Sequence, residues 1–258
     1  MIKAIFFDID GTLVSFKTHR MPESTVKAIE EIRKKGIKVF VATGRHFSAI
    51  NNLGDVSFDG YITMNGCYCL AGKDKVIFKQ SIPQSDIETF IDYLENIDPF
   101  PCLFVEENKL SVNMVNTDVQ YLFKLLNFIE IPTKPLEYYR DKEVFQLTAF
   151  FTKEQEEQVM QSLPNGSAMR WYPTFADVIS TGIDKGVGID RIGEYFGFTA
   201  SETIAFGDGG NDVEMIRHAG IGIVMGNADE SVKSIADYVT DSVDNDGILK
   251  ALQHFDII

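Results

Sequence analysis

Residues 5–13 read Ile-Phe-Phe-Asp-Ile-Asp-Gly-Thr-Leu, a short apolar run that leads directly into two carboxylates. The run at 5–7 is typical of a central strand in a parallel sheet, which is covered on both faces. Asp8 and Asp10 are two residues apart, so an extended backbone points both side chains the same way. Close like charges do not both ionise cheaply without a cation. The stretch predicts a ligand site at the carboxyl edge of a sheet, and the alternative is a polar turn that caps the next element.

A second strand, expected at residues 203–206, ends in the same way. It leads into Gly-Asp-Gly-Gly-Asn-Asp at 207–212, where the glycines permit sharp turns and a close approach of the backbone to a ligand. Asp212 lies four residues beyond Asp208, at the expected start of a helix. It can cap that helix and also support a metal, and the two roles are compatible.

Two further positions offer hydrogen-bond donors. Thr43, within Val-Ala-Thr-Gly-Arg at 41–45, presents a hydroxyl and a backbone N–H at an expected helix start. That is a good arrangement for an anion, although threonine is also a common helix cap. Lys185 opens another expected helix, where a cation opposes the helix dipole. Its position hints at a function, and a solvated lysine is the alternative.

Together these residues fit one chemistry, phosphoryl transfer. The carboxylates of Asp8 and Asp208, with a backbone carbonyl and waters, make the all-oxygen octahedron that Mg²⁺ prefers. Thr43 and Lys185 supply donors for the phosphoryl oxygens. Asp8 at the strand end can act as nucleophile and form an aspartyl-phosphate. Asp10 lies close enough to protonate the leaving oxygen and later to activate water.

The order of expected elements indicates two domains. Alternating strands and helices imply a parallel sheet with right-handed crossovers over residues 1–81 and 184–258. Helix pairs with adjacent antiparallel strands describe an inserted α+β domain at 82–183. The expected strands are 3–7, 38–42, 61–64, 102–106, 110–115, 144–151, 168–172, 176–180, 203–206 and 221–224. The expected helices are 22–35, 45–53, 86–96, 118–128, 154–163, 185–197, 211–218, 229–236 and one from 247.

Charge and composition exclude several classes of partner. The 258 residues include 38 acidic and 24 basic side chains, a net charge of −14. That field repels nucleic acid and anionic membrane. No apolar run approaches the ~20 residues of a membrane-spanning helix. The first strand follows Met1 so closely that we expect no signal peptide.

The cysteines and histidines show neither the pattern of a disulfide-bonded protein nor the spacing of a zinc site. Cys67, Cys69 and Cys102 are expected to be reduced, partly buried thiols of a cytoplasmic protein. None of the histidines has the spacing to cysteine that a zinc site requires. They are expected at the surface or at element edges, at positions 19, 46, 218 and 254.

The separated motifs resemble those of the haloacid dehalogenase superfamily, in particular its Cof-type phosphatases with a C2-type cap. They read Asp-Ile-Asp-Gly-Thr-Leu at 8–13, Ala-Thr-Gly-Arg at 42–45, Met-Asn-Gly at 64–66, Asp-Lys-Gly at 184–186 and Gly-Asp-Gly-Gly-Asn-Asp at 207–212. Further matches follow at 219–228 and 236–240. The resemblance implies a Rossmann-like core, an inserted cap and Mg²⁺-dependent hydrolysis of phosphate monoesters.

The same resemblance implies roles for individual residues. Asp10 is expected to bind Mg²⁺ through its backbone carbonyl, and Asn211 and Asp212 to support metal and phosphate. The expected catalytic residues are Asp8 and Asp10. The expected metal ligands are Asp8, Asp10, Asp208 and Asp212, and the expected phosphate-binding residues are Thr43, Gly44, Arg45, Lys185 and Asn211.

The expected substrate comes from the resemblance to the subfamily alone, because the sequence of the cap does not indicate which substrate it selects. The resemblance favours a small phosphorylated metabolite, above all a hexose phosphate, with pyridoxal phosphate or a flavin-precursor phosphate as alternatives. A phosphomutase and a non-catalytic phosphometabolite sensor are the rival functions. Residues 170–173, Arg-Trp-Tyr-Pro, can line the entrance or anchor the core of the cap. We expect a monomer or weak homodimer, with hinges near 81–83 and 181–183.

Overall fold

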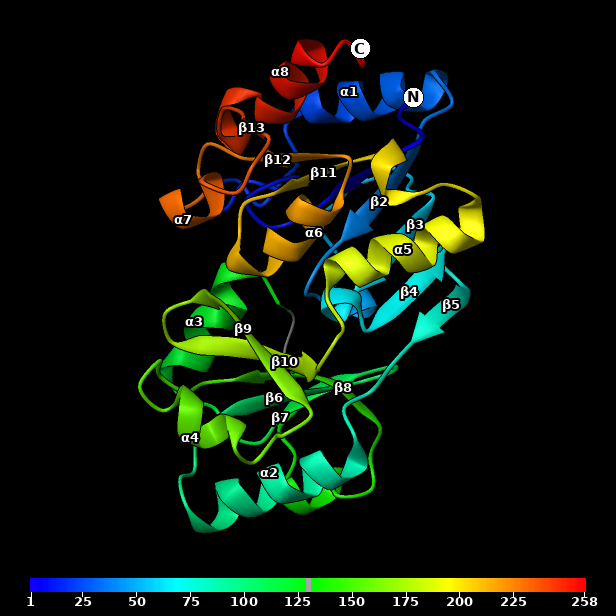
Figure 1. The fold of residues 1–258 in the computed structure, drawn as a ribbon. Coiled ribbons are helices and arrows are strands. Elements are labelled where there is room, and N and C mark those ends of the chain that lie inside the picture. The colour runs from blue at the N-terminus through cyan, green and yellow to red at the C-terminus, as the bar shows by residue number, and fades with distance from the viewer. Residues whose placement is uncertain (129–130) are drawn as a thin grey trace. The chain divides into compact units, whose positions relative to one another are not determined.

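The computed structural model describes residues 1–128 and 131–258, and the chain divides into two compact units (Figure 1). The core unit comprises Met1–Arg45, Ile50–Lys79 and Asp184–Ile258. The inserted unit comprises His46–Ala49 and Gln80–Ile183. In the described residues, no helix combines the length and apolar character needed to cross a membrane.

The core unit is built on an eight-stranded sheet in the order β13-β12-β11-β1-β2-β3-β4-β5. The first six strands of this order are parallel to their neighbours, and β4 and β5 add an antiparallel edge. The strands are β1 Ala4–Phe7, β2 Lys38–Ala42, β3 Gly60–Thr63, β4 Tyr68–Ala71, β5 Lys75–Lys79, β11 Thr203–Gly207, β12 Ile221–Val224 and β13 Tyr238–Val239.

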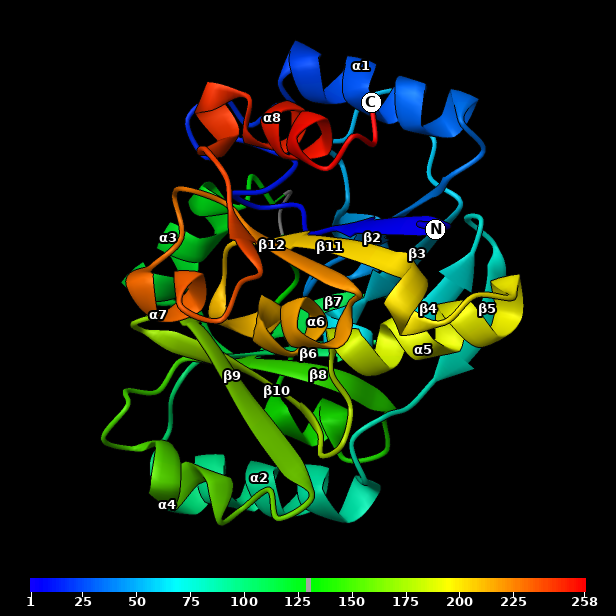
Figure 2. The same cartoon turned by 45° about the horizontal axis from the view of Figure 1, so that its top comes forward.

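Helices cover both faces of this sheet, and both views show this (Figures 1 and 2). On one face lie α1 Glu23–Lys34 and α8 Gly247–His254, and on the other α5 Lys185–Phe196 and α6 Val213–His218. A short helix, α7 Glu230–Lys233, lies between β12 and β13 in the chain. Phe6 and Phe40 stack at 4.9 Å in the apolar core beneath α5 and α6. This double coverage explains why the strands read as continuous apolar runs.

The inserted unit is an antiparallel sheet in the order β7-β6-β8-β10-β9. Its strands are β6 Cys102–Glu106, β7 Leu110–Val112, β8 Val144–Ala149, β9 Gly166–Tyr172 and β10 Phe175–Ser180. One apolar core packs α2 Gln84–Asn96 and α4 Glu156–Met160 on the sheet, and a second packs α3 Thr117–Leu125. The predicted fold class, a parallel α/β sheet plus an α+β unit, is confirmed.

Several predicted elements were wrong. The helix expected at 45–53 is only a single 3₁₀ turn, Phe47–Ala49. The imidazole of His46 contacts the Ser48 hydroxyl at 2.7 Å and the backbone oxygen of Glu107 at 3.0 Å. Residues 46–49 belong to the inserted unit, and His46 is buried, so of the two positions expected for the histidines, the surface or an element edge, the surface was wrong for His46. The antiparallel strands β4 and β5 and the two-residue β13 were missed.

Candidate active site

The site residues lie where neighbouring parallel strands of the core unit end. Asp8 follows β1, Asp208 follows β11 and Thr43 follows β2. Because β11, β1 and β2 are adjacent and parallel, their carboxyl ends meet at one edge of the sheet. This is the edge at which open α/β sheets bind their ligands.

Lys185 is at the centre of the charged cluster and is fully buried, so the solvated alternative was wrong. Its Nζ donates to Asp8 Oδ1 at 2.7 Å and to Asp212 Oδ1 at 2.6 Å. Burial works against the charged ammonium, but Asp212 and Asp8 outweigh it and raise the pKa of Lys185. The lysine is therefore held as a fixed cation between two carboxylates.

Asp212 shapes the loop that carries Asp208. Its Oδ2 accepts the backbone N–H groups of Asp208 at 3.0 Å and Gly209 at 2.9 Å, while Oδ1 accepts from Lys185. The side chain thus caps the turn and also reaches the charged cluster. It makes no cap hydrogen bond to α6, so the helix-cap role expected from the sequence was wrong, and support of a metal stays a prediction.

Asp208 is oriented by hydrogen bonds to both of its carboxylate oxygens. Thr12 Oγ1 donates to Oδ1 at 2.8 Å, and Asn227 Nδ2 donates to Oδ2 at 3.0 Å. Gly11 has a φ of +89°, and a Cβ there would lie 2.1 Å from Asp208 Oδ2. Only glycine leaves room for the carboxylate, which explains the glycine of the first motif.

The cluster carries more negative charge than its lysine neutralises. Burial raises the pKa of Asp8 to about 7, against attraction by Lys185 and with repulsion from Asp212 and Asp10. Burial, with repulsion from Asp8 and Asp212, also raises the pKa of Asp208 well above its usual value. Carboxylate oxygens of Asp8, Asp208 and Asp212 all lie within 4.8 Å of one another. An oxygen-rich, electron-rich cluster of this size suits a hard divalent cation such as Mg²⁺.

Thr43 differs from expectation in one respect. Its backbone N–H donates to Ile62 O at 2.8 Å, and no α-helix begins after it. The predicted backbone donor is therefore engaged by β3, and the hydroxyl is what Thr43 offers to an anion. That hydroxyl oxygen accepts the N–H of Arg45 at 3.1 Å, so its proton points elsewhere. Gly44 lies between them and is half-buried.

Arg45 was expected to bind phosphate, but the structure places it on Asp10. Its Nε donates to Asp10 Oδ2 at 2.6 Å and its Nη2 to Asp10 Oδ1 at 2.7 Å. Asn211 Nδ2 donates to Asn65 Oδ1 at 2.9 Å. These bonds bring all of the predicted site residues to the same edge of the core unit.

Three residues that orient the site were not among those predicted: Thr12, Asn65 and Asn227. Asn65 is fully buried and has a φ of +53°, in the left-handed region. The signal was available, because Asn-Gly at 65–66 follows a strand and asparagine tolerates that conformation. Thr12 and Asn227 lie inside two of the sequence motifs, but their bonds to Asp208, 196 and 19 residues away, are seen only in the structure.

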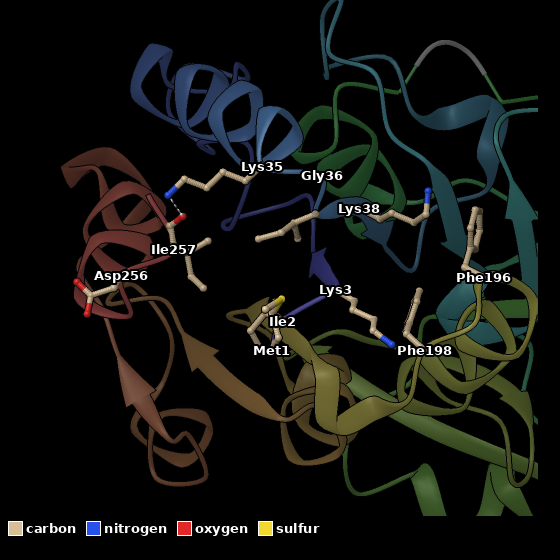
Figure 3. A pocket seen from close by; sticks show the side chains of 11 residues that line it. Met1, Ile2, Lys3, Lys35, Gly36, Lys38, Phe196, Phe198, Asp256 and Ile257 are labelled. Carbon is tan, nitrogen blue, oxygen red and sulfur yellow. Dashed lines mark hydrogen bonds between the residues drawn. The ribbon is translucent and has the colours of Figure 1, made fainter.

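A hollow of about 500 Å³ lies at the opposite edge of the same sheet (Figure 3). Lys3 and Lys38 on its wall stand at the beginning of the strands whose ends carry Asp8 and Thr43. Its lysines are already engaged: Lys3 pairs with Glu202 at 2.8 Å, and Lys35 donates to Ile257 O at 2.6 Å. This hollow therefore adds nothing to the carboxylate cluster.

In the inserted unit, residues 170–173 are held by internal contacts. Trp171 Nε1 donates to Asp177 Oδ2 at 3.0 Å, and its ring packs edge-on against Phe175 at 4.8 Å. Arg170 pairs with Glu156 at 3.1 Å and donates to three backbone oxygens. These contacts favour the anchoring role over the entrance role.

The comparisons with known proteins agree on one family. The chain matches the haloacid dehalogenase-like hydrolases over residues 5–252. It is 32% identical to a putative phosphatase, YkrA of Bacillus subtilis, over 99% of this chain and 98% of that protein. It is 29% identical to YcsE of the same organism, a 5-amino-6-(5-phospho-D-ribitylamino)uracil phosphatase, over 98% and 96%. The solved structure of the subclass IIB sugar phosphatase BT4131 is 50% identical and superposes with a TM-score of 0.95, covering 99% of this chain and 100% of that one.

Proposed function

This chain belongs to the haloacid dehalogenase-like hydrolases and is a phosphatase, and from that premise we propose that it hydrolyses hexose phosphates with the help of Mg²⁺. The observation that carries the chemistry is the buried cluster of Asp8, Asp212 and Lys185 beside Asp208 and Asp10. A cluster of this kind costs stability and is expected only where it has a function.

In the first half-reaction an Asp8 carboxylate oxygen attacks the phosphorus of the monoester. The bond from phosphorus to the leaving oxygen breaks, and the carboxyl proton of Asp10 passes to that oxygen. The products are a free alcohol and an aspartyl-phosphate on Asp8. Lys185, already bonded to Asp8 Oδ1, stands next to the atoms on which negative charge develops.

In the second half-reaction a water molecule attacks the phosphorus of the aspartyl-phosphate. Its proton passes to the Asp10 carboxylate, and the bond between Asp8 and phosphorus breaks. Inorganic phosphate leaves, Asp8 is again a carboxylate and Asp10 is again protonated. The hydroxyl of Thr43 and the amide of Asn211 are the neutral donors proposed for the phosphoryl oxygens.

The proposed holders of Mg²⁺ are the Asp8 and Asp208 carboxylates and the Asp10 backbone carbonyl, with Asp212 in support. The donor set is all oxygen, and burial, with repulsion between the carboxylates, raises the pKa of Asp8 and of Asp208, so a bound cation would favour their ionised forms. When bound, Mg²⁺ would supply neutralisation of the carboxylates and of the phosphoryl oxygens.

A hexose phosphate is favoured as the substrate because the 50%-identical BT4131 is a sugar phosphatase. A flavin-precursor phosphate is the second candidate, supported by the 29%-identical YcsE. The inserted unit is proposed to select among them, because the carboxylate cluster of the core unit contacts only the phosphoryl group in this mechanism. The buried thiols of Cys67, Cys69 and Cys102 support the cytoplasmic location expected from the sequence.

Phosphate release from a panel of metabolites tests the proposal. The panel contains hexose phosphates, pyridoxal phosphate and a phosphorylated flavin precursor, each assayed with Mg²⁺, with EDTA, and with EDTA followed by excess Mg²⁺. We expect the fastest release from a hexose phosphate, loss of release in EDTA and recovery with Mg²⁺. Full activity after chelation contradicts the metal assignment. Transfer of the phosphoryl group to another position of the sugar, without release, indicates a phosphomutase, and binding without turnover indicates a sensor.

A further inference from the structure

Arg45 and Asp10 form a paired contact that the proposed mechanism does not yet use. Two adjacent guanidinium nitrogens, Nε and Nη2, donate to the two oxygens of one carboxylate at 2.6 and 2.7 Å. The Arg45 side chain is 3% exposed and that of Asp10 is 17% exposed. Such a fork-to-fork pair fixes the plane of the carboxylate as well as its distance.

The backbone of Arg45 is anchored at both ends, so the guanidinium extends from a fixed point. Its N–H donates to the hydroxyl oxygen of Thr43 at 3.1 Å, and its carbonyl accepts the N–H of Met64 at 3.1 Å. A side chain held in this way restricts its partner more than a lysine on a flexible stem does. The Asp10 carboxylate is therefore oriented by a residue whose own backbone is hydrogen-bonded on both sides.

The charge balance argues against a second use of the same nitrogens. If Arg45 turned to a phosphate, the mostly buried Asp10 carboxylate would lose both of its bonds to Nε and Nη2. Lys185 already supplies a cation at Asp8, at 2.7 Å from the proposed nucleophile. We propose that Arg45 is a positioning residue that holds the Asp10 carboxylate for proton transfer, and that it is not a ligand of the substrate phosphate.

This inference rests on the proposed function and predicts a specific defect. Proton transfer by a side chain depends on the aim of its oxygen, and both half-reactions pass a proton through Asp10. Loss of Arg45 should therefore slow proton transfer while leaving phosphate binding intact. An ester whose alcohol leaves without a proton should escape the defect in the first half-reaction but not in the second.

The experiment compares the wild-type protein with Arg45→Gln and Arg45→Lys on p-nitrophenyl phosphate and phenyl phosphate, with Mg²⁺ present. In Arg45→Gln we expect a burst of one p-nitrophenol per protein, because nitrophenolate leaves unaided and hydrolysis of the aspartyl-phosphate then slows by about 100-fold. Phenyl phosphate, a poorer leaving group of similar shape, should show slow first turnover and no burst. Inhibition by inorganic phosphate should change by less than about 3-fold.

Further variants separate this role from the alternatives. Arg45→Lys keeps the charge without the fork and should recover only part of the rate. Adding Arg45→Gln to Asp10→Asn should cause little further loss, because the two residues act as one unit. Arg33→Gln, which removes a core-unit ion pair to Asp59 at 3.0 Å, is the matched control and should behave as wild type.

Two results would overturn the inference. One is weaker inhibition by inorganic phosphate in Arg45→Gln, by about 10-fold or more, which identifies a phosphate ligand. The other is an equal loss on both esters with no burst, which identifies a general structural role. Phosphate release by the wild-type protein tests the proposed function separately, because it does not depend on Arg45 being altered.

Discussion

A charged cluster in the core unit and an ion pair in the inserted unit lie in opposite surroundings. In the core unit, Lys185 is fully buried with Asp8 and Asp212 as its partners. In the inserted unit, Arg140 lies near the surface and pairs with Asp92 and Glu95, carboxylates that are 63% and 37% exposed. Surface pairs contribute little to stability, whereas buried charges are costly unless their partners are fixed. The buried cluster is therefore the costlier of the two arrangements, which supports the chemical role proposed for it.

The sharpest test of this contrast is Asp8→Asn. The amide is a poor nucleophile, so turnover should fall by about 10⁴-fold or more while the fold persists. Phosphate release and circular dichroism measure the two quantities. Near-normal turnover in a folded variant would remove Asp8 from the role of nucleophile.

The same variant tests the electrostatic cost of the site. The folded pKa of Asp8, about 7, lies above its ordinary value of 3.8. Its contribution to stability is therefore present below about pH 4 and is lost as the pH rises through about 7. In EDTA, the melting temperature of Asp8→Asn relative to wild type should rise between pH 5 and pH 8. A relative melting temperature that is constant with pH would contradict the raised pKa.

The next largest effect is expected for Lys185→Met. Methionine fills similar space but leaves two buried carboxylates without their cation, which should lower the free energy of unfolding by about 3–5 kcal/mol. Chemical denaturation measures the change. Arg140→Gln is the matched control in the inserted unit, and we expect little change in its melting temperature because its partners are solvated. Equal losses in the two variants would erase the distinction between the units.

A smaller effect is expected for Asn227→Ala. The amide of Asn227 bonds both Asp208 Oδ2 and the carbonyl of Gly11, each at 3.0 Å, so it orients a proposed metal ligand. Mutation of a residue that orients a metal ligand typically lowers the metal affinity by about 10–100-fold. Calorimetric titration with Mg²⁺ should show weakened binding with little change in the number of sites. Unchanged affinity would assign Asn227 to loop structure alone, through its bond to Val243 N.

The core unit also shows how far a sequence can be read. Residues 5–7 and 204–206 are apolar because both faces of their strands are covered, so the strands and the carboxylates that follow them were predictable. The partner of Arg45 could not be predicted, because the choice between a phosphate and Asp10 depends on packing between residues 35 positions apart. The burial of Lys185 depends in the same way on Asp8, 177 positions away.

The failed helix at 45–53 has a related cause. Its apolar spacing suited a helix, but the side chains of Arg45 and His46 are committed to Asp10 and to the backbone of Glu107. Asn51, Asn52 and Gly54 also have low helix propensity, which disfavours a helix in this segment. The strands β4 and β5 were missed for another reason, because β4 (Tyr-Cys-Leu-Ala) is apolar and buried and β5 contains Val-Ile-Phe. Both are short and antiparallel, so they lie outside the alternation of strands and helices on which the prediction rested.

The smallest predicted effect lies in the inserted unit and concerns Trp171→Phe. Phenylalanine keeps much of the edge-on packing against Phe175 but removes the indole N–H that donates to Asp177. Asp177 is 3% exposed and still accepts from Thr148 at 2.7 Å, so the loss should be about 1–2 kcal/mol in the free energy of unfolding. Mg²⁺ affinity should not change, because neither residue belongs to the core unit that holds the proposed ligands. Denaturant titration and Mg²⁺ calorimetry on the same preparation measure both quantities. A loss of Mg²⁺ affinity without a loss of stability would show that Trp171 serves the site directly, and that the division of labour between the two units is wrong.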